Sequence, residues 1–380
     1  MSRVVLPGEA IGIVGGGQLA RMGALAARAM GYRVIVADPD PACPAAPVAD
    51  AVVQARLDSP EAVAPLAEQV AVVTYEFENI DPAVLERLAE RVPVYPGVHV
   101  LRASQHRILE KTALSEMGVP VAPWRPVTSA REFRAALAAV GLPAVLKTAT
   151  MGYDGKGQVV IRRPEEAEGA YARLAGAGPL VLEGFVPFTM EVSVVVARNA
   201  TGEVRTFPVA ENIHRNNILD LSIVPARVAP ETAVRAAELA VRVAERLEVI
   251  GLLAVEMFVL PDGGLLVNEL APRPHNSGHY TMDGCVTSQF EQHIRAVAGL
   301  PLGAVDLLSP VVMVNIMGEH FPLDIPAALT DPHVKLHLYG KREARPGRKM
   351  GHLNALAPAV DEALERGRAA LRRLAGDGRA

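Results

Sequence analysis

The sequence predicts a multidomain protein of α/β and α+β units that begins with a doubly wound parallel α/β domain. Its length of 380 residues exceeds one ordinary domain of roughly 150 residues. Apolar, strand-like segments alternate with amphipathic helical segments in the N-terminal part, as in a parallel sheet covered by helices. Farther along, strand-like segments come in pairs joined by glycine-rich turns, which is typical of antiparallel hairpins.

The N-terminal part opens with a strand–turn–helix–strand unit. An apolar strand (AIGIVGG) leads into a segment of helical spacing and then a second strand (YRVIVADPD). The alternation continues, and we expect helices at about 60–69 and 82–91 on either side of a strand at 71–77. A doubly wound domain of about 100 residues follows from this pattern.

A new unit begins near residue 104 with an amphipathic helix that ends at Gly118. A strand interrupted by proline follows it. Further strands and one long helix are expected at 143–149, 158–163, 179–185, 190–198, 230–248, 252–260, 265–270 and 310–318. We divide the chain into an N-terminal α/β domain, a central lobe, a larger mixed lobe and a small C-terminal lobe, at residues 1–103, 104–186, 187–300 and 301–380.

Composition excludes several classes of function. Half of the residues are apolar and 21% are charged, which supports a folded globular chain. The formal net charge of −4 gives no broad positive surface, so we expect no nucleic-acid partner. Cys43 and Cys285 lack the spacing of a metal site or disulfide framework and fit a reducing compartment. Without a secretory pattern or an apolar run of about 18 residues, we expect a cytoplasmic protein that does not enter membranes.

The segment GIVGGGQLA follows a strand and opens a helix, and Asp38 closes the next strand. The dinucleotide-binding pattern is incomplete, because Ala20 stands where a third glycine is usual. A phosphate-bearing ligand at the helix N-terminus is favoured, since unpaired amides and the helix dipole attract anions. A tight turn without a ligand and an NAD(P) site are the alternatives.

Two glutamates are expected to face each other across a hairpin. The turn Pro261-Asp262-Gly263-Gly264 separates two apolar strands, and pairing of Leu260 with Leu265 brings Glu256 opposite Glu269. Opposed carboxylates repel each other unless a cation lies between them. Oxygen ligands favour a hard ion such as Mg²⁺. The alternative is a pair of solvated carboxylates on an exposed sheet face.

The glycine-rich loop LKTATMGYDGKGQ joins two predicted strands. Gly152, Gly155 and Gly157 allow backbone amides to close over phosphates, while Lys147 and Lys156 supply positive charge. The order of a Walker A motif is absent. We therefore expect a different kind of phosphate-covering flap, with a bare hairpin turn as the alternative.

Three further segments concentrate polar chemistry. TYEFENI ends a predicted parallel strand, where open sheets bind ligands, and Glu76 and Glu78 can accept hydrogen bonds from an amine or a ribose. APRPHNSGH directly follows Glu269, and RPGRKMGH is basic enough to bind a phosphate. The alternatives are a plain strand end, a rigid surface loop and a solvated basic loop.

Together these segments resemble the ATP-grasp superfamily, which has a strand lysine, a glycine flap, an adenine-contacting strand end (VLEGFV) and two hairpin glutamates. Within it, GGGQLARM, TYEFENI, GYDGKGQ, ENIHRNNI, NELAPRPHNSGHYTMDGC and RPGRKMGHLN resemble the N5-carboxyaminoimidazole ribonucleotide synthetases over nearly the whole chain. The resemblance implies an N-terminal α/β domain, an ATP-grasp fold and a small C-terminal lobe. One departure is Leu270-Ala271 after Glu269, where many relatives have an asparagine metal ligand, so Asn268, water or phosphate oxygens complete the shell.

The resemblance also implies site residues. The ATP contacts fall on Arg107, Lys147, Gly152, Tyr153, Asp154, Gly155, Lys156, Gly157, Gln158, Glu183, Gly184, Phe185, Val186, Glu191, His214, Asn268 and Glu269. The ribonucleotide contacts fall on Gln18, Glu76, Tyr153, Asp154, Arg273, His275, Lys341, Arg348 and Lys349. The catalytic groups fall on Arg273, His275, Asp154 and Lys349, and the metal ligands on Glu256 and Glu269.

The implied reaction belongs to purine biosynthesis. ATP, bicarbonate and 5-aminoimidazole ribonucleotide give ADP, phosphate and the N-carboxylated nucleotide through carboxyphosphate, with Mg²⁺ or Mn²⁺ as metal and a homodimer as the assembly. Arg273 and His275 are expected to hold bicarbonate, and Asp154 or His275 to take the amine proton. The alternatives are another ATP-grasp ligase, an NAD(P)-dependent oxidoreductase and a nucleotide-binding regulator without catalysis.

Overall fold

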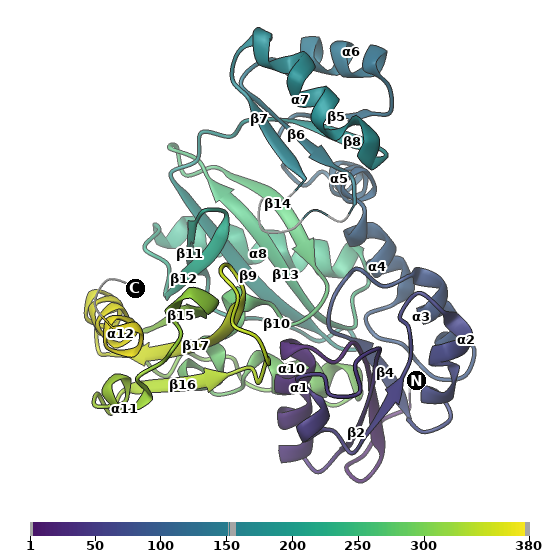
Figure 1. Cartoon of the computed structure of the whole chain (residues 1–380), viewed down its shortest axis with the longest axis vertical. Helices are drawn as coiled ribbons and strands as arrows, with labels where there is room; N and C mark the ends of the chain where they lie inside the picture. Colours follow the sequence, from purple (N-terminus) through teal and green to yellow (C-terminus); the bar gives the residue numbers. More distant parts are fainter. Residues whose placement is uncertain (1–2, 151, 153–156, 377–380) are drawn as a thin grey trace.

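The computed structural model describes residues 3–150, 152 and 157–376, which form three sheets and their covering helices (Figure 1). The N-terminal sheet has four parallel strands in the order β3-β2-β1-β4. Its elements are β1 (Ala10–Val14), α1 (Gln18–Ala29), β2 (Arg33–Asp38), β3 (Ala51–Gln54), α2 (Pro60–Val63), β4 (Val72–Tyr75), α3 (Pro82–Ala89) and α4 (Val98–Gln105). The helix α4 was not among the helices expected from the sequence.

Helices cover both faces of this sheet, which confirms the predicted doubly wound domain. One core lies under α2 and α3 and includes Leu66 and Leu85. The other lies under α1 and is completed by Ile294 on α10 (Gln289–Val297), a helix that follows the second sheet in the chain. A buried hydrogen bond of 2.7 Å between Thr74 Oγ1 and His293 Nε2 fixes α10 to β4. The N-terminal sheet is thereby attached to the middle of the molecule.

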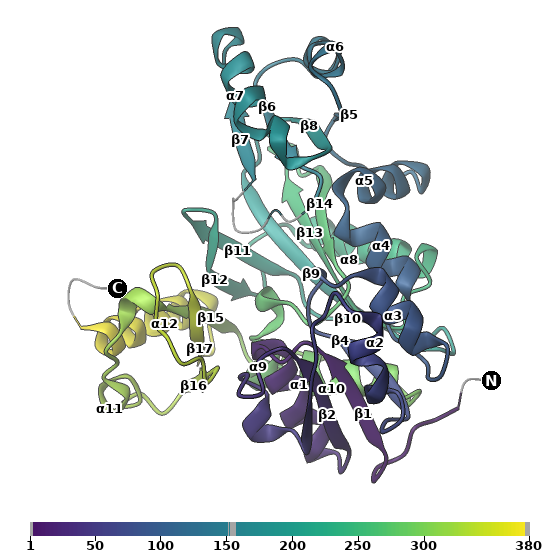
Figure 2. The ribbon, with the colours of Figure 1, turned by 45° about the vertical axis from the view of Figure 1, so that its right-hand side comes forward.

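A second, antiparallel sheet in the order β5-β8-β6-β7 forms the lobe that carries the glycine loop. This lobe stands apart from the other two sheets (Figure 2). The helix α5 leads into it, and α6 and α7 cover one face with an apolar core. Its elements are α5 (Arg107–Glu116), β5 (Trp124–Val127), α6 (Ala130–Val140), β6 (Ala144–Thr148), β7 (Gln158–Ile161), α7 (Ala167–Leu174) and β8 (Leu180–Gly184).

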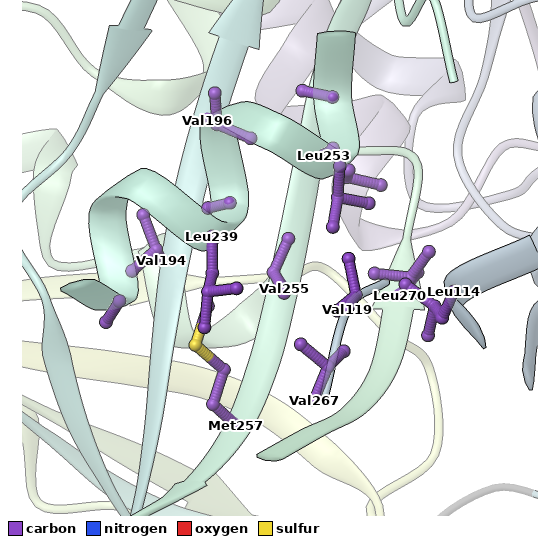
Figure 3. Packing of buried hydrophobic residues seen from close by; sticks show 14 of the residues in the cluster. Leu114, Val119, Val194, Val196, Leu239, Leu253, Val255, Met257, Val267 and Leu270 are labelled. Atoms are coloured by element: carbon purple, nitrogen blue, oxygen red, sulfur yellow. The ribbon is translucent and has the colours of Figure 1, made fainter. Parts of the chain in front are cut away.

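The third sheet has nine strands and runs through the centre of the molecule. Its main order is β14-β13-β9-β11-β12-β15-β17-β16, and β10 pairs with β9. The elements up to residue 297 are β9 (Met190–Arg198), β10 (Val204–Thr206), β11 (Ala210–Arg215), β12 (Ile218–Val224), α8 (Pro230–Arg246), β13 (Gly251–Val259), β14 (Leu265–Ala271), α9 (Thr281–Gly284) and α10. Leu239 of α8 packs against Val255 and Met257 of β13 (Figure 3).

The C-terminal part extends the same sheet with β15 (Val311–Met317), β16 (Val334–Leu338) and β17 (Lys349–Leu356), covered by α11 (Ile325–Ala328) and α12 (Val360–Ala375). The sequence analysis treated the segment around β17 as a basic stretch only. The strand was missed because it is buried on both faces and carries the polar residues His352 and Asn354 inside, so it shows no alternation. Within the described residues, no helix is both long and apolar enough to cross a membrane.

Candidate active site

A cleft of about 760 Å³ lies where the three sheets approach one another. Its lining is polar and apolar in about equal parts and comes from the ends of β4, β6, β8 and β14, from α5, and from the loop after β14. The predicted site residues that line it are Gln18, Glu76, Arg107, Lys147, Gly152, Gln158, Glu183, Gly184, Phe185, Val186, Glu191, His214, Glu256, Asn268, Glu269, Arg273, His275, Lys341 and Lys349.

Two described residues of the predicted set do not line this cleft. The Gly157 carbonyl accepts a hydrogen bond from the Thr148 amide at 2.8 Å, and its φ of +72° favours glycine. A Cβ at this position lies 2.5 Å from Thr148 Oγ1, so Gly157 shapes the base of the loop. Arg348 donates to the carbonyl of Glu343 at 3.0 Å. The remaining predicted residues, Tyr153, Asp154, Gly155 and Lys156, lie outside the described part of the chain.

Glu256 and Glu269 pair directly across the β13–β14 hairpin, which confirms the predicted opposition. The predicted pairing of Leu260 with Leu265 is wrong, because Val259 is the partner of Leu265. Pairing near the turn is therefore displaced by one residue. A β-bulge at Asn268 takes up the extra residue and returns the two glutamates to register.

The two glutamates differ in electrostatic environment. Burial and the neighbouring Glu269 carboxylate raise the pKa of Glu256 to about 8. The side chain of Glu269 is 41% exposed, and Arg107, whose guanidinium lies 3.2 Å away, outweighs the effect of desolvation and lowers the pKa of Glu269. The buried Asn268 Oδ1 has no hydrogen-bond partner among the described residues. Two carboxylates and an orphaned amide oxygen form a donor set that fits a hard divalent cation.

A buried charge cluster joins α5, β6, β8 and β14. Lys147 Nζ lies 3.1 Å and Lys111 Nζ 3.6 Å from Glu183 Oε2. Burial alone raises the pKa of this carboxyl, but the nearby cations outweigh it and lower the pKa of Glu183 to about 2. Lys111 also donates to the Asn268 carbonyl at 2.8 Å, and thus holds the bulge in place.

The strand end after Glu183 gives the cleft an apolar edge. Phe185 lines the cleft and is 43% exposed. Phe188, also in the cleft, stacks on Phe258 of β13 with ring centroids 4.6 Å apart. Flat apolar surface next to backbone polar groups is suited to an aromatic base.

The glycine turn before α1 is engaged by protein carboxylates. Glu76 accepts hydrogen bonds from the amides of Gly17 and Ala20, and Asp38 accepts one from the amide of Gly16 at 2.8 Å. Glu76 and Asp38 thus already engage the amides of Gly16, Gly17 and Ala20, which argues against a phosphate at these three groups. A phosphate at the remaining amides of this helix N-terminus stays a prediction. Asp38 is equally unavailable for a ribose, which removes the basis of an NAD(P) site.

The loop after β14 brings the predicted anion-binding groups to the β13–β14 hairpin that carries Glu256 and Glu269. Arg273 Nε lies 2.9 Å from Glu78 Oε1, and His275 Nε2 lies 3.3 Å from Glu256 Oε1. Burial, together with the charge of Arg273, places the pKa of His275 well below its usual value. Two lysines of the C-terminal part also line the cleft, where Lys341 donates to the carbonyl of Lys349 at 2.7 Å. The cleft thus joins a carboxylate pair to a cationic wall.

Comparison with known proteins agrees with this geometry. The ribonucleotide synthetase preATP-grasp domain matches residues 9–105, the ATP-grasp domain 112–290, and the phosphoribosylaminoimidazole carboxylase C-terminal domain 311–366. The N5-carboxyaminoimidazole ribonucleotide synthase of Bacillus subtilis (strain 168) is 50% identical over 362 residues, which covers 95% of this chain and 94% of the relative. The chain belongs to the N5-carboxyaminoimidazole ribonucleotide synthetase family.

Solved structures of this synthetase family superpose closely on the chain. A synthetase in complex with ADP is 51% identical with a TM-score of 0.92, covering 97% of this chain and 98% of the other. The synthase of Aspergillus clavatus in complex with ADP and 5-aminoimidazole ribonucleotide is 32% identical with a TM-score of 0.89, covering 96% and 98%. The family confirms the predicted resemblance and the ATP-grasp fold, and it excludes an oxidoreductase built on the N-terminal glycine turn.

Three residues were missed by sequence reasoning: Glu110, Lys111 and Gln289. Glu110 and Lys111 follow the predicted Arg107 on α5 by three and four residues, and this spacing, which places the three on one face of the helix, is a sequence signal. The buried Glu110 accepts a hydrogen bond from the Leu270 amide, and burial raises the pKa of Glu110 to about 8. Gln289 accepts from the His275 amide at 2.9 Å and donates to the His275 carbonyl at 2.8 Å. No local pattern marks Gln289.

Proposed function

We propose that the chain is an ATP-dependent carbon–nitrogen ligase that carboxylates 5-aminoimidazole ribonucleotide with bicarbonate in purine biosynthesis. The carrying observation is the 3.3 Å approach of His275 on the anion-binding loop to Glu256 on the metal hairpin. This approach supports a site in which a phosphoryl donor binds next to a small anion. The names of the family's relatives and the ligands of the Aspergillus clavatus structure support the same substrates.

In the first step, a bicarbonate oxygen attacks the γ-phosphorus of ATP, the bond from that phosphorus to the β-phosphate oxygen breaks, and carboxyphosphate and ADP result. Lys147 and Arg107 line the nucleotide side of the cleft and can neutralise charge on the transferred group. Arg273 presents a planar guanidinium to the bicarbonate. These residues contribute mainly by positioning and charge neutralisation.

Glu256, Glu269 and Asn268 are the proposed ligands of Mg²⁺, with Mn²⁺ as an alternative. The buried, unpartnered Oδ1 of Asn268, and the burial and repulsion by Glu269 that raise the pKa of Glu256, support this assignment. The metal supplies charge stabilisation on the phosphate oxygens when it is bound. Arg107 already holds Glu269 in its charged form, which suits a ligand that must be deprotonated.

In the second step, the amine nitrogen attacks the carbon of carboxyphosphate, a carbon–nitrogen bond forms, and phosphate leaves with the bridging oxygen. The amine proton passes to a base, for which Asp154 and His275 are the two candidates. Lys341 and Lys349 lie in the cleft and are proposed, with Gln18 and Glu76, to bind the ribonucleotide. The positive charges of Lys341 and Lys349 are suited to binding the phosphate group of the ribonucleotide.

The test is release of ADP from Mg-ATP and bicarbonate, with and without 5-aminoimidazole ribonucleotide, combined with trapping of the acid-labile product. The proposal predicts strong stimulation by the ribonucleotide and one carboxylation for each ADP. Stimulation by a different acid or amine keeps the ligase and rejects the substrate. Absence of turnover favours the nucleotide-binding regulator.

We also propose that the chain forms a homodimer in the cytoplasm. Cys43 and Cys285 are buried free thiols, which suits a reducing compartment. Sedimentation equilibrium of the full chain tests the dimer, since a mass of one chain at micromolar concentration contradicts it.

A further inference from the structure

A buried chain of hydrogen bonds leads from β12 to His275. Ser222 Oγ donates to Asn212 Oδ1 at 2.8 Å, and Asn212 Nδ2 donates to Ser193 Oγ at 2.9 Å. Ser193 Oγ then donates to Ser277 Oγ at 2.8 Å, and Ser277 Oγ lies 2.9 Å from His275 Nδ1. The four residues before His275 are each at most 5% exposed. They occupy three strands of the central sheet and the turn after His275.

At the His275 end of this series of hydrogen bonds, a backbone group indicates in which direction the hydroxyl groups donate. The Ser277 amide donates to His275 Nδ1 at 3.4 Å. A backbone N–H can only donate, so His275 Nδ1 is the unprotonated nitrogen of the ring. Ser277 Oγ can then donate to the same nitrogen, which agrees with the direction set by the Asn212 amide.

Hydrogen bonds donated in the opposite direction would conflict with the backbone amide of Ser277. If Asn212 were turned to accept from Ser193, each hydroxyl would donate the other way and His275 Nδ1 would carry the proton. That proton would face the N–H of Ser277. The bond that one ring nitrogen makes sets the protonation of the other, so Nε2 carries the hydrogen.

We propose that Asn212, Ser193 and Ser277 are positioning residues that keep the His275 proton on Nε2, so that the ring presents a hydrogen-bond donor to the cleft. In this tautomer Nε2 has no lone pair for a proton. The Nε2 hydrogen faces Glu256 Oε1, 3.3 Å away, and the same donor can turn to an oxygen of bicarbonate or carboxyphosphate bound beside that carboxyl. Of the two candidate bases for the amine proton, this leaves Asp154. The choice of ligand rests on the proposed function, whereas the tautomer does not.

The backbone around His275 is fixed by a second neutral contact. Gln289, which is fully buried, hydrogen-bonds both the amide and the carbonyl of His275 through one side-chain amide. A Cβ on Gly278 lies 2.5 Å from Gln289 Oε1, so a glycine is needed for this approach. The ring has little freedom to turn and exchange its two nitrogens.

The direct test is the nitrogen-15 spectrum of the full chain labelled at histidine, with His275→Gln identifying the signals. Long-range couplings distinguish the two ring nitrogens. The proposal predicts an unprotonated Nδ1 and a protonated Nε2. A protonated Nδ1 in the wild-type protein overturns it, whatever substrate the enzyme turns over, and failure of ribonucleotide-dependent ADP release affects only the proposed function.

Variants test whether this series of hydrogen bonds affects catalysis. Asn212→Asp replaces the donor with an acceptor of similar size, and Ser193→Ala interrupts the chain without a new charge if Asn212→Asp does not fold. Both variants keep the Ser277 amide contact with Nδ1, which at 3.4 Å is the longer of the two contacts, but disturb the shorter 2.9 Å contact with Ser277 Oγ. We therefore expect the His275 signals to shift partly toward the other tautomer and kcat to fall by about 10- to 100-fold, with KM for ATP unchanged. Ser222→Ala is the matched control, because Asn212 Nδ2 still donates and the tautomer is kept. Wild-type tautomer and kcat in both Ser193→Ala and Asn212→Asp contradict the proposal.

Discussion

The two walls of the cleft are held by different forces. On the nucleotide side, Lys111, Lys147 and Glu183 form a buried cluster of charges, and Arg107 pairs with Glu269. On the opposite side, Arg273 of the loop after β14 pairs with Glu78, but His275 itself is held by neutral groups: serine hydroxyls, side-chain amides and backbone. Buried charges depend strongly on their partners, whereas neutral hydrogen bonds contribute less and tolerate change better.

This difference suits the chemistry of each wall. In the proposed reaction, the side with Lys147 and Glu269 exchanges protein partners for phosphate and metal, and charged groups can re-pair with a charged ligand. The loop must present one ring nitrogen in a fixed orientation, and a neutral network does this without competing for anions. Four predictions test this contrast, from the largest expected effect to the smallest.

Lys111→Met should destabilise the protein most. It keeps much of the side-chain volume but leaves Glu183 and the Asn268 carbonyl with fewer partners in a site that is fully buried. Loss of one partner of a buried ion pair costs about 3–5 kcal/mol. Denaturant unfolding measures this, with exposed Lys335→Met as the control. If Lys111→Met loses no more free energy of unfolding than Lys335→Met, the proposed difference between the two walls is contradicted.

Glu269→Gln should abolish most turnover with a smaller effect on folding. It removes a proposed metal ligand and the partner of Arg107. Loss of one such electrostatic group lowers kcat by about 10²- to 10³-fold. Steady-state ADP release is the assay, and Glu238→Gln on the exposed face of α8 is the control. Near-normal activity refutes the metal assignment.

Low pH should reduce the stabilisation that the buried charges around Glu183 contribute. The folded pKa of Glu183, about 2, is below the unfolded value of about 4.3, so its stabilisation is complete above that value and is lost as the pH falls toward 2. The stability difference between wild type and Glu183→Gln, on the order of 3 kcal/mol, should shrink over this range. Trp124, the only tryptophan, pairs with Glu183 across β5 and β8 and reports the change by fluorescence. A constant difference contradicts the prediction.

Gln289→Leu should have the smallest effect. It leaves the amide and carbonyl of His275 without their partner, which costs about 1–3 kcal/mol. We expect lower kcat with KM for ATP retained, because Gln289 lies on the neutral side. Unfolding and kinetics are compared with exposed Gln69→Leu. A rise in KM for ATP as large as that of Glu269→Gln removes the distinction between the two walls.

Local rules were enough to predict most of the elements from the sequence. The opposed glutamates were predicted from a turn register that is wrong by one residue, and they pair because the bulge at Asn268 compensates for it. The bulge, whose carbonyl at Asn268 is bound by Lys111, could not be read from the local sequence. The partners of Glu76 and the role of Gln289 were missed for the same reason. Each contact joins segments that only the packing of α1 and α10 brings together.

The central claim is that ATP activates bicarbonate before the amine attacks. Reaction with oxygen-18 bicarbonate, Mg-ATP and 5-aminoimidazole ribonucleotide tests this, with the released phosphate analysed by mass spectrometry. The account predicts one bicarbonate oxygen in each phosphate, since the bridging oxygen of carboxyphosphate leaves with phosphorus. Phosphate that carries no oxygen-18 contradicts it.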